Sequence, residues 1–427
     1  MFMLLLKTKY FLVLGGAMQL LVRPKPYSDE SLESYLLRLS QDNGFEYYQI
    51  LSGSIKEHLY QYDHQAASVF PLELEKVNVY HANISSALRL RALCLIEELT
   101  SQAPATVLQL ALMHSSMTFG PGYKSVHRSG TDLPLCFLRP NVIPCCPECL
   151  SESAYIRHYW HYMPYIACHT HGRKLLFHCP HCGAALNYMK NESLTHCSCS
   201  FDLRFATTEP SSKNEEMVSG SVSGMNSDGS NPLFVSDNLS MRYGALLWYC
   251  LRNEIDHGEN AACSKFSLAY EYFNNWPNNF YEELQKLTSD AMLRQTNRLN
   301  YMSLNDIYKS TLINCRQLPF RDIEQNFVLD ALLSFFIDLI RDNPKRHIPN
   351  IADLRLSVKD AACLLSTTVS HIFRLIDDGY LPLAIKPSRM REITHFLPIL
   401  RLRQIIEFRL AYKPRSDFRK QNYVSRR

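Results

Sequence analysis

Cysteine spacing is the feature of this 427-residue chain that points most directly to chemistry. Eight of its fourteen cysteines lie between residues 145 and 199, interleaved with histidines. Seven of these cysteines and His171 form two quartets of paired ligands, and a structural zinc ion takes four ligands, usually from two turns. The sequence therefore predicts two structural zinc ions. The first would bind Cys146, Cys149, Cys168 and His171, and the second would bind Cys179, Cys182, Cys197 and Cys199.

Several other cysteines and histidines lie beside these ligands. Cys145 would make a less usual spacing with Cys149, so we expect it to be a buried thiol outside the metal site. His169 and His181 lie inside the ligand turns, where side chains normally face solvent. We expect His161, next to Trp160, to be a core histidine whose polar atoms are satisfied.

Enzymatic interpretations of this cluster have less support. A catalytic zinc keeps an open ligand position, whereas both quartets are complete. The His-x-Glu of zinc deaminases does not precede the cysteines. A redox pair needs free thiols, which metal binding would consume. The chain also has no P-loop motif and no apolar run long enough to span a membrane, so we expect neither an ATPase nor a membrane protein.

Positive charge is concentrated at the C-terminal end. The net charge is +4, but residues 385–427 alone contain twelve Lys or Arg and three Asp or Glu. This tail suggests contact with a polyanion or an acidic partner, with Arg415, Arg419 and Lys420 as candidate residues. A solvated helix end is an equally simple interpretation.

Composition and periodicity suggest a mainly α chain made of consecutive regions. Residues 1–17 are either an upstream start wrongly included before Met18 or a targeting segment. Residues 18–142 read as a helical, helix-turn-helix region. Within it we expect a helix capped by Ser28 or Asp29 and ended by Asn43-Gly44, helices at 85–101 and from Pro104, and a loop at 115–135. The cysteine/histidine module follows at 143–206, a Ser/Gly/Asn-rich flexible linker at 207–236, and a C-terminal helical domain at 237–427.

Residues 357–379 predict a helix-turn-helix. Ser357 and Asp360 can form a capping box, Thr367 or Thr368 can cap a second helix, and Gly379 can end it. On that second helix, Ser370, His371 and Arg374 are the candidates for contact with a nucleic-acid groove or a partner.

An ordered set of motifs resembles the TniQ family of transposition proteins. Near the N-terminus, Glu30, Ser31, Leu32, Arg38 and the Asn43-Gly44 pair match the family pattern. The motifs "CCPECL", "YWHY", "CHTHG", "CPHCG" and "CSC" follow in order. After the predicted linker, "FNNWPNNF", "LPFRDIEQN" and "YVSRR" are similar to the compact TniQ proteins of type I-F CRISPR-associated transposons. The N-terminal extension and the long 207–236 segment depart from that pattern.

The resemblance implies a non-catalytic target selector in the bacterial cytoplasm. Such proteins form a head-to-tail homodimer that binds the guide-RNA complex Cascade and helps to recruit a TnsC-type AAA+ ATPase. It also implies a C-terminal TniQ-type helical domain. An alternative within the same family is a sequence-specific DNA-binding selector of the TnsD type.

Overall fold

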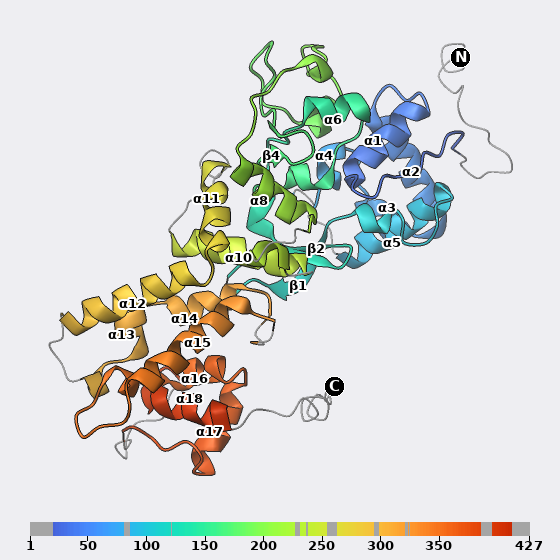
Figure 1. The fold of residues 1–427 in the computed structure, drawn as a ribbon. Helices are drawn as coiled ribbons and strands as arrows, with labels where there is room; N and C mark the ends of the chain where they lie inside the picture. Colours follow the sequence, from blue (N-terminus) through green and yellow to red (C-terminus); the bar gives the residue numbers. More distant parts are fainter. Residues whose placement is uncertain are drawn as a thin grey trace, which may run out of the picture. The chain divides into compact units, whose positions relative to one another are not determined.

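The computed structural model describes residues 20–80, 86–120, 122–226, 231–235, 238–253, 263–293, 299–320, 323, 325–385 and 395–411. The chain divides into two compact units, residues 1–271 and 272–427. Figure 1 shows that helices predominate in both units and that the strands are short.

The first unit begins with helices and continues through a small sheet into the cysteine/histidine module. Its helices are α1 (Leu32–Asp42), α2 (Tyr48–Tyr62), α3 (His64–Val69), α4 (Leu74–Val77), α5 (Ser86–Leu99), α6 (Pro147–Glu152), α7 (Tyr188–Asn191), α8 (Lys213–Ser223), α9 (Pro232–Val235), α10 (Leu239–Arg252) and α11 (Cys263–Asn274), the last of which reaches into the second unit. Short 3-10 turns connect them at Leu108–Leu110, Leu135–Phe137, His158–His161 and Leu203–Phe205.

Helix α1 begins later than the sequence predicts. Its N-cap is Ser31, whose hydroxyl accepts a hydrogen bond from the Ser34 backbone N–H at 3.2 Å, so the cap predicted at Ser28 or Asp29 is wrong. The chain still turns just before the helix, where the Glu30 N–H donates to the Tyr27 carbonyl. The buried Glu30 carboxylate accepts two hydrogen bonds from Arg38, at 2.9 and 2.8 Å, which fixes this turn against α1.

Residues 113–134 form a three-stranded antiparallel sheet, so the loop predicted at 115–135 is wrong. The helix predicted from Pro104 is also wrong, because Ala105 has a φ of 67°, outside the helical region, and only the 3-10 turn Leu108–Leu110 forms before the sheet. The strands are β1 (Met113–Thr118), β2 (Lys124–Arg128) and β3 (Thr131–Pro134), in the order β1-β2-β3. Ser129 and Gly130, with φ of 45° and 84°, make the two-residue turn between β2 and β3. Periodicity did not predict β1. Its side chains alternate in exposure, but because most of them are polar, the sequence does not show the alternation of apolar and polar residues that indicates a strand.

The segment predicted as a flexible linker, 207–236, contains helix α8. A capping box of Ser212 and Glu215 starts the helix, and Val218, Ser219 and Val222 are buried against the rest of the first unit. The boundary between compact units lies instead between residues 271 and 272. A Ser/Gly-rich composition predicted flexibility, but the small side chains let α8 pack closely on the module.

The second unit is helical with one short strand pair. Its elements are α12 (Asn278–Leu293), α13 (Leu304–Tyr308), α14 (Thr311–Asn314), α15 (Phe327–Asp342), β6 (Arg355–Ser357), α16 (Val358–Leu364), α17 (Val369–Asp377), β7 (Pro398–Arg401) and α18 (Leu402–Ala411), with 3-10 turns η5 (Leu299–Tyr301), η6 (Cys315–Gln317) and η7 (Ile351–Asp353). The antiparallel β6–β7 pair brackets α16 and α17 in the sequence.

The helices predicted within 357–379 are present with the predicted caps. Ser357 and Asp360 form a capping box at α16, the Thr368 hydroxyl caps α17, and Gly379 follows α17 with a φ of 80°. Helices α16 and α17 contact each other across the tight turn, and Ala361 and Ala362 of α16 are buried.

Candidate metal centres

A helix start and a hairpin bring the first quartet together. Cys146 is the N-cap of α6 and Pro147 occupies the first helical position, so Cys149 comes back toward Cys146 after one turn. The hairpin of β4 (Ala167–Cys168) and β5 (Arg173–Lys174) contributes Cys168 and His171.

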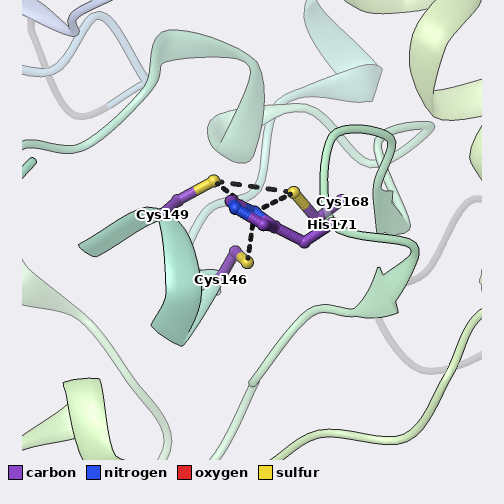
Figure 2. A group of neighbouring side chains, drawn as sticks. All are labelled: Cys146, Cys149, Cys168 and His171. Atoms are coloured by element: carbon purple, nitrogen blue, oxygen red, sulfur yellow. Dashed lines mark hydrogen bonds between the residues drawn. The ribbon is translucent and has the colours of Figure 1, made fainter. Parts of the chain in front are cut away.

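The four side chains of this cluster point toward one another (Figure 2). The sulfurs of Cys149 and Cys168 are 3.5 Å apart. His171 Nδ1 lies 3.6, 3.3 and 3.4 Å from the sulfurs of Cys146, Cys149 and Cys168. The three cysteines are buried and the histidine is partly exposed.

A carboxylate holds the outer side of the His171 ring. Glu152, at the end of α6, places Oε1 2.9 Å from His171 Nε2, so this nitrogen carries the proton and Nδ1 is free to bind a metal. No sequence motif singled out Glu152. It stands one helical turn beyond Cys149, and that spacing was the only available signal.

The second quartet is built from two tight turns. Gly183, with a φ of 73°, donates its N–H to the Cys179 carbonyl, which folds the Cys179–Cys182 turn. The sulfurs of Cys179 and Cys199 are 3.7 Å apart and those of Cys182 and Cys197 are 3.6 Å apart. Cys182 and Cys199 reach the surface, so this centre is more accessible than the first.

Both quartets have the size that tetrahedral zinc requires. Ligands at a Zn–S distance of about 2.3 Å are separated by about 3.8 Å, and a sulfur and an imidazole nitrogen by about 3.6 Å. The S···S distances of 3.5 to 3.7 Å and S···N distances of 3.3 to 3.6 Å agree with these values. Each cluster can therefore hold one metal ion through four protein ligands. Such an ion supplies folding free energy by joining two turns.

Hydrogen bonding among the thiols decides where negative charge resides. Contacts with the Cys146 and Cys149 side chains lower the pKa of Cys168, whereas contacts with Cys146 and Cys168 raise the pKa of Cys149. In the second quartet burial opposes ionisation, but hydrogen bonds from the Cys199 backbone and from Ser198 help to lower the pKa of Cys197 to about 7. Each centre thus contains a thiol that readily becomes the thiolate needed to bind a metal.

Cys145 lies outside both clusters, as the spacing suggested. Its side chain is 3% exposed, and burial raises the pKa of its thiol. Its backbone pairs with Leu176 in both directions, at 3.1 and 2.8 Å. Cys145 therefore joins the backbones on either side of the first centre without supplying a ligand.

The histidines beside the ligands have different environments. His161 is buried, with Nε2 3.0 Å from the Tyr188 hydroxyl, which agrees with its prediction as a core residue. His181 is exposed and stacks on Phe201. The prediction that His169 faces solvent is wrong. Its ring is partly buried, and its Nδ1 lies 2.9 Å from the Tyr165 hydroxyl.

Helix α8 supports the first centre directly. The buried Ser219 hydroxyl accepts hydrogen bonds from the backbone N–H groups of Ile166 and Ala167, at 3.0 and 2.9 Å. Ala167 immediately precedes the ligand Cys168, so α8 holds the ligand strand in place. Sequence reasoning missed this role because it treated α8 as linker.

The candidate interaction residues fall into two groups. Ser370, His371 and Arg374 are all exposed on α17. Arg415, Arg419 and Lys420 lie outside the described residues.

The helical fold and the two clusters define a protein with a cysteine/histidine module, set among helices, that can hold two metal ions. The family model for TniQ matches residues 21–175 of the chain. The match covers α1 through β5 and the whole first quartet, and it ends before Cys179. TniQ family proteins are transposition-associated, non-catalytic adaptors and target selectors. No curated protein matches the chain. Among the described helices, none is long and apolar enough to cross a membrane.

Proposed function

We propose that this protein is a non-catalytic target-selection adaptor in RNA-guided DNA transposition. It links a type I-F Cascade complex with its guide RNA to a TnsC-type AAA+ ATPase and, through that ATPase, to the transposase. The observation that carries this proposal is the match of the TniQ family model to residues 21–175. The second compact unit, residues 272–427, contains the motifs similar to type I-F TniQ proteins and supports this particular branch.

Zinc is the metal we propose for both centres. Thiolate-rich tetrahedral sets with no fifth protein donor are typical of structural zinc. The two ions hold a module in which several cysteines and histidines replace part of a hydrophobic core. Their role is to position surfaces and not to activate water, since four protein ligands leave no open position at either ion.

The proposed assembly is a head-to-tail homodimer in the bacterial cytoplasm. In it the N-terminal helical region of one chain contacts the C-terminal helical domain of the other. Light scattering on the zinc-loaded protein should give twice the chain mass of 49.3 kDa. A monomer at all concentrations would contradict the dimer without affecting the adaptor role.

Co-purification tests the adaptor role. Tagged zinc-loaded protein should retain a type I-F Cascade with its guide RNA at low salt, and the complex should then retain the AAA+ ATPase in the presence of ATP. No retention of Cascade at low salt would exclude the type I-F assignment. Cascade without guide RNA provides the control for nonspecific charge interactions.

A DNA-binding selector of the TnsD type is the second candidate. The exposure of Ser370, His371 and Arg374 on α17 favours it, because a recognition helix presents such residues to the major groove. Selection from random-sequence duplex DNA should then return one site, and Arg374→Ala should relax the preference at one position. Recovery of no common site would reject this candidate.

A further inference from the structure

The β6–β7 strand pair presents two arginines side by side. Arg355 of β6 is directly opposite Arg401 of β7, and the next pair is Leu356 and Leu400. Both leucines are fully buried, whereas the arginines are partly exposed. Because side chains alternate across a strand, Arg355 and Arg401 share the outer face of the pair.

This arrangement is unfavourable for the isolated protein. Like charges directly opposite on antiparallel strands destabilise the pair. Within the part of the chain that the structure describes, neither guanidinium forms a salt bridge or a side-chain hydrogen bond, and Arg355 Nε is buried without a partner. Burial and then the charge of Arg401 lower the pKa of Arg355, and no carboxylate opposes them.

An exposed aromatic ring completes the surface. Tyr301, at the end of η5, is 62% exposed, and the Arg355 guanidinium lies over its ring at 4.8 Å from the centroid. The backbone of Arg355 fixes this contact, since its N–H donates to the Met302 carbonyl at 2.9 Å. The ring and both charges are therefore positioned by secondary structure and not by flexible loops.

The chain entering η7 adds further positive charge to this part of the second unit. Lys345 and Arg346 are exposed, and neither forms a salt bridge to a described residue. The buried Arg403 secures both ends of their loop, donating to the Asn343 carbonyl at 2.8 Å and to Asn350 Oδ1 at 2.9 Å. The following turn, η7, contacts η5, which carries Tyr301.

We propose that Arg355, Arg401 and Tyr301 form a binding surface for the sugar–phosphate backbone of a nucleic acid. Two apposed guanidiniums without carboxylate partners suit successive phosphates, and bidentate contacts with phosphate relieve their repulsion. The exposed ring can stack on a base or sugar, a function that an acidic peptide would not use. The surface contains no residue of α17, and it operates whether or not the protein binds Cascade.

Salt-dependent binding of the double variant Arg355→Gln/Arg401→Gln tests the proposal. The probes are a labelled single-stranded RNA and a duplex DNA of equal length, each titrated over a salt series with the zinc-loaded full chain. Loss of two phosphate contacts should reduce the slope of log K against log salt by about 1.4 for the single strand or about 1.8 for the duplex. Whichever probe shows the change identifies the nucleic acid.

A matched variant separates this site from general charge. Lys286→Gln/Lys309→Gln removes two exposed positive charges from α12 and the end of α13, and its slope should remain that of the wild type. The thermal midpoint of the arginine double variant should be unchanged or higher, because the repulsion between the two guanidiniums is removed, so weaker binding cannot be ascribed to unfolding. Equal slopes for wild type and the arginine double variant on both probes would overturn the proposal. So would loss of binding only to a poly-glutamate probe, which would assign the surface to an acidic protein.

Discussion

The His171 imidazole lies between three cysteine sulfurs and the Glu152 carboxylate, and the contact with the carboxylate can be tested at a single residue. Glu152→Gln keeps the size of the side chain but removes the charge that orients the ring and increases its basicity. We expect the zinc affinity of the first centre to fall about 10-fold to 100-fold, with saturation still at two ions per chain. Competition with a chromophoric chelator measures the affinity.

Glu148→Gln is the matched control for this prediction. Glu148 lies on the same helix but pairs with Arg173 at 3.4 Å and does not contact a ligand. Its substitution should leave zinc affinity unchanged. Equal losses in the two variants would mean that the contact between Glu152 and His171 has no role in metal binding.

The doubled cysteine gives a second residue-level prediction. Cys146→Ala removes a ligand and should reduce tightly bound zinc from two ions to one per chain, whereas Cys145→Ala should retain both. Native mass spectrometry of the intact protein distinguishes the two outcomes. A loss of zinc from the Cys145 variant alone would reverse the assignment.

Spacing was sufficient to predict which eight side chains come together in two clusters, because metal geometry requires paired donors on tight turns. It did not predict Glu152 or Ser219. Their roles depend on which side chains face the ligands after folding, and one sequence does not contain that information. Cys145 could be distinguished from Cys146 as the cysteine outside the metal site only because its spacing to Cys149 is unusual for a pair of ligands on one turn.

At the scale of elements, α8 should stabilise the first centre through Ser219. Ser219→Ala leaves two buried backbone N–H groups without an acceptor, which costs about 1–3 kcal/mol. We expect a lower free energy of unfolding and faster zinc release from the first centre. Denaturant unfolding and chelator competition measure the two effects.

Ser221→Ala is the control within the same helix. Its buried hydroxyl only donates to the Val218 carbonyl of its own helix, so its loss leaves no buried donor unpaired. The destabilisation should be smaller than for Ser219→Ala. An equal effect would show that packing of α8, and not its hydrogen bonds to the ligand strand, accounts for the change.

The buried His161 makes the stability of the folded protein depend on pH. The Asn78 amide can only donate to Nδ1, at 3.4 Å, so Nε2 carries the proton toward Tyr188. Burial lowers the pKa of His161, while in the unfolded chain it is about 6.5. As pH falls, His161 therefore takes up its proton in the unfolded chain before it does so in the folded protein. The contribution of neutral His161 to folding stability is complete above about pH 6.5 and is lost as pH falls below it.

His161→Gln should reduce the acid sensitivity of unfolding. Consider the pH range between the pKa of His161 in the folded protein and its pKa in the unfolded chain. There, the free energy of unfolding of the wild type falls by up to about 1.4 kcal/mol per pH unit more than that of the variant. Denaturant unfolding of both proteins over the acid range checks this, because the zinc ligands titrate in both and cancel in the difference. Parallel pH profiles would show that His161 is not neutral in the folded protein.

Elements were predictable where local signals were strong. The α16–α17 pair carried a capping box, a threonine cap and a terminal glycine, and it has the predicted boundaries. The β1–β3 sheet and α8 were missed because polar or small residues obscure their buried faces. In both cases tertiary packing, and not local propensity, stabilises the element.

At the scale of the whole molecule, the cysteine/histidine module belongs to the first compact unit and is not a separate unit. Helices α8 and α10 follow it within that unit, and the division comes only at residues 271 and 272. Composition predicted a domain boundary at 207–236, because a Ser/Gly/Asn-rich segment is typical of a flexible linker. Composition does not show whether small side chains pack closely against the rest of the unit. The exposed candidates on α17 and the β6–β7 arginines lie in the other unit.

Guide-directed integration is the decisive assay for the adaptor role. A reconstituted type I-F transposition system is assayed with and without this chain, while Cascade binding at the guide-matched target is measured in parallel. An adaptor without catalytic function predicts that Cascade still binds the target in its absence but that insertion beside the target is lost. Undiminished insertion at the guide-matched site without this chain would contradict the account.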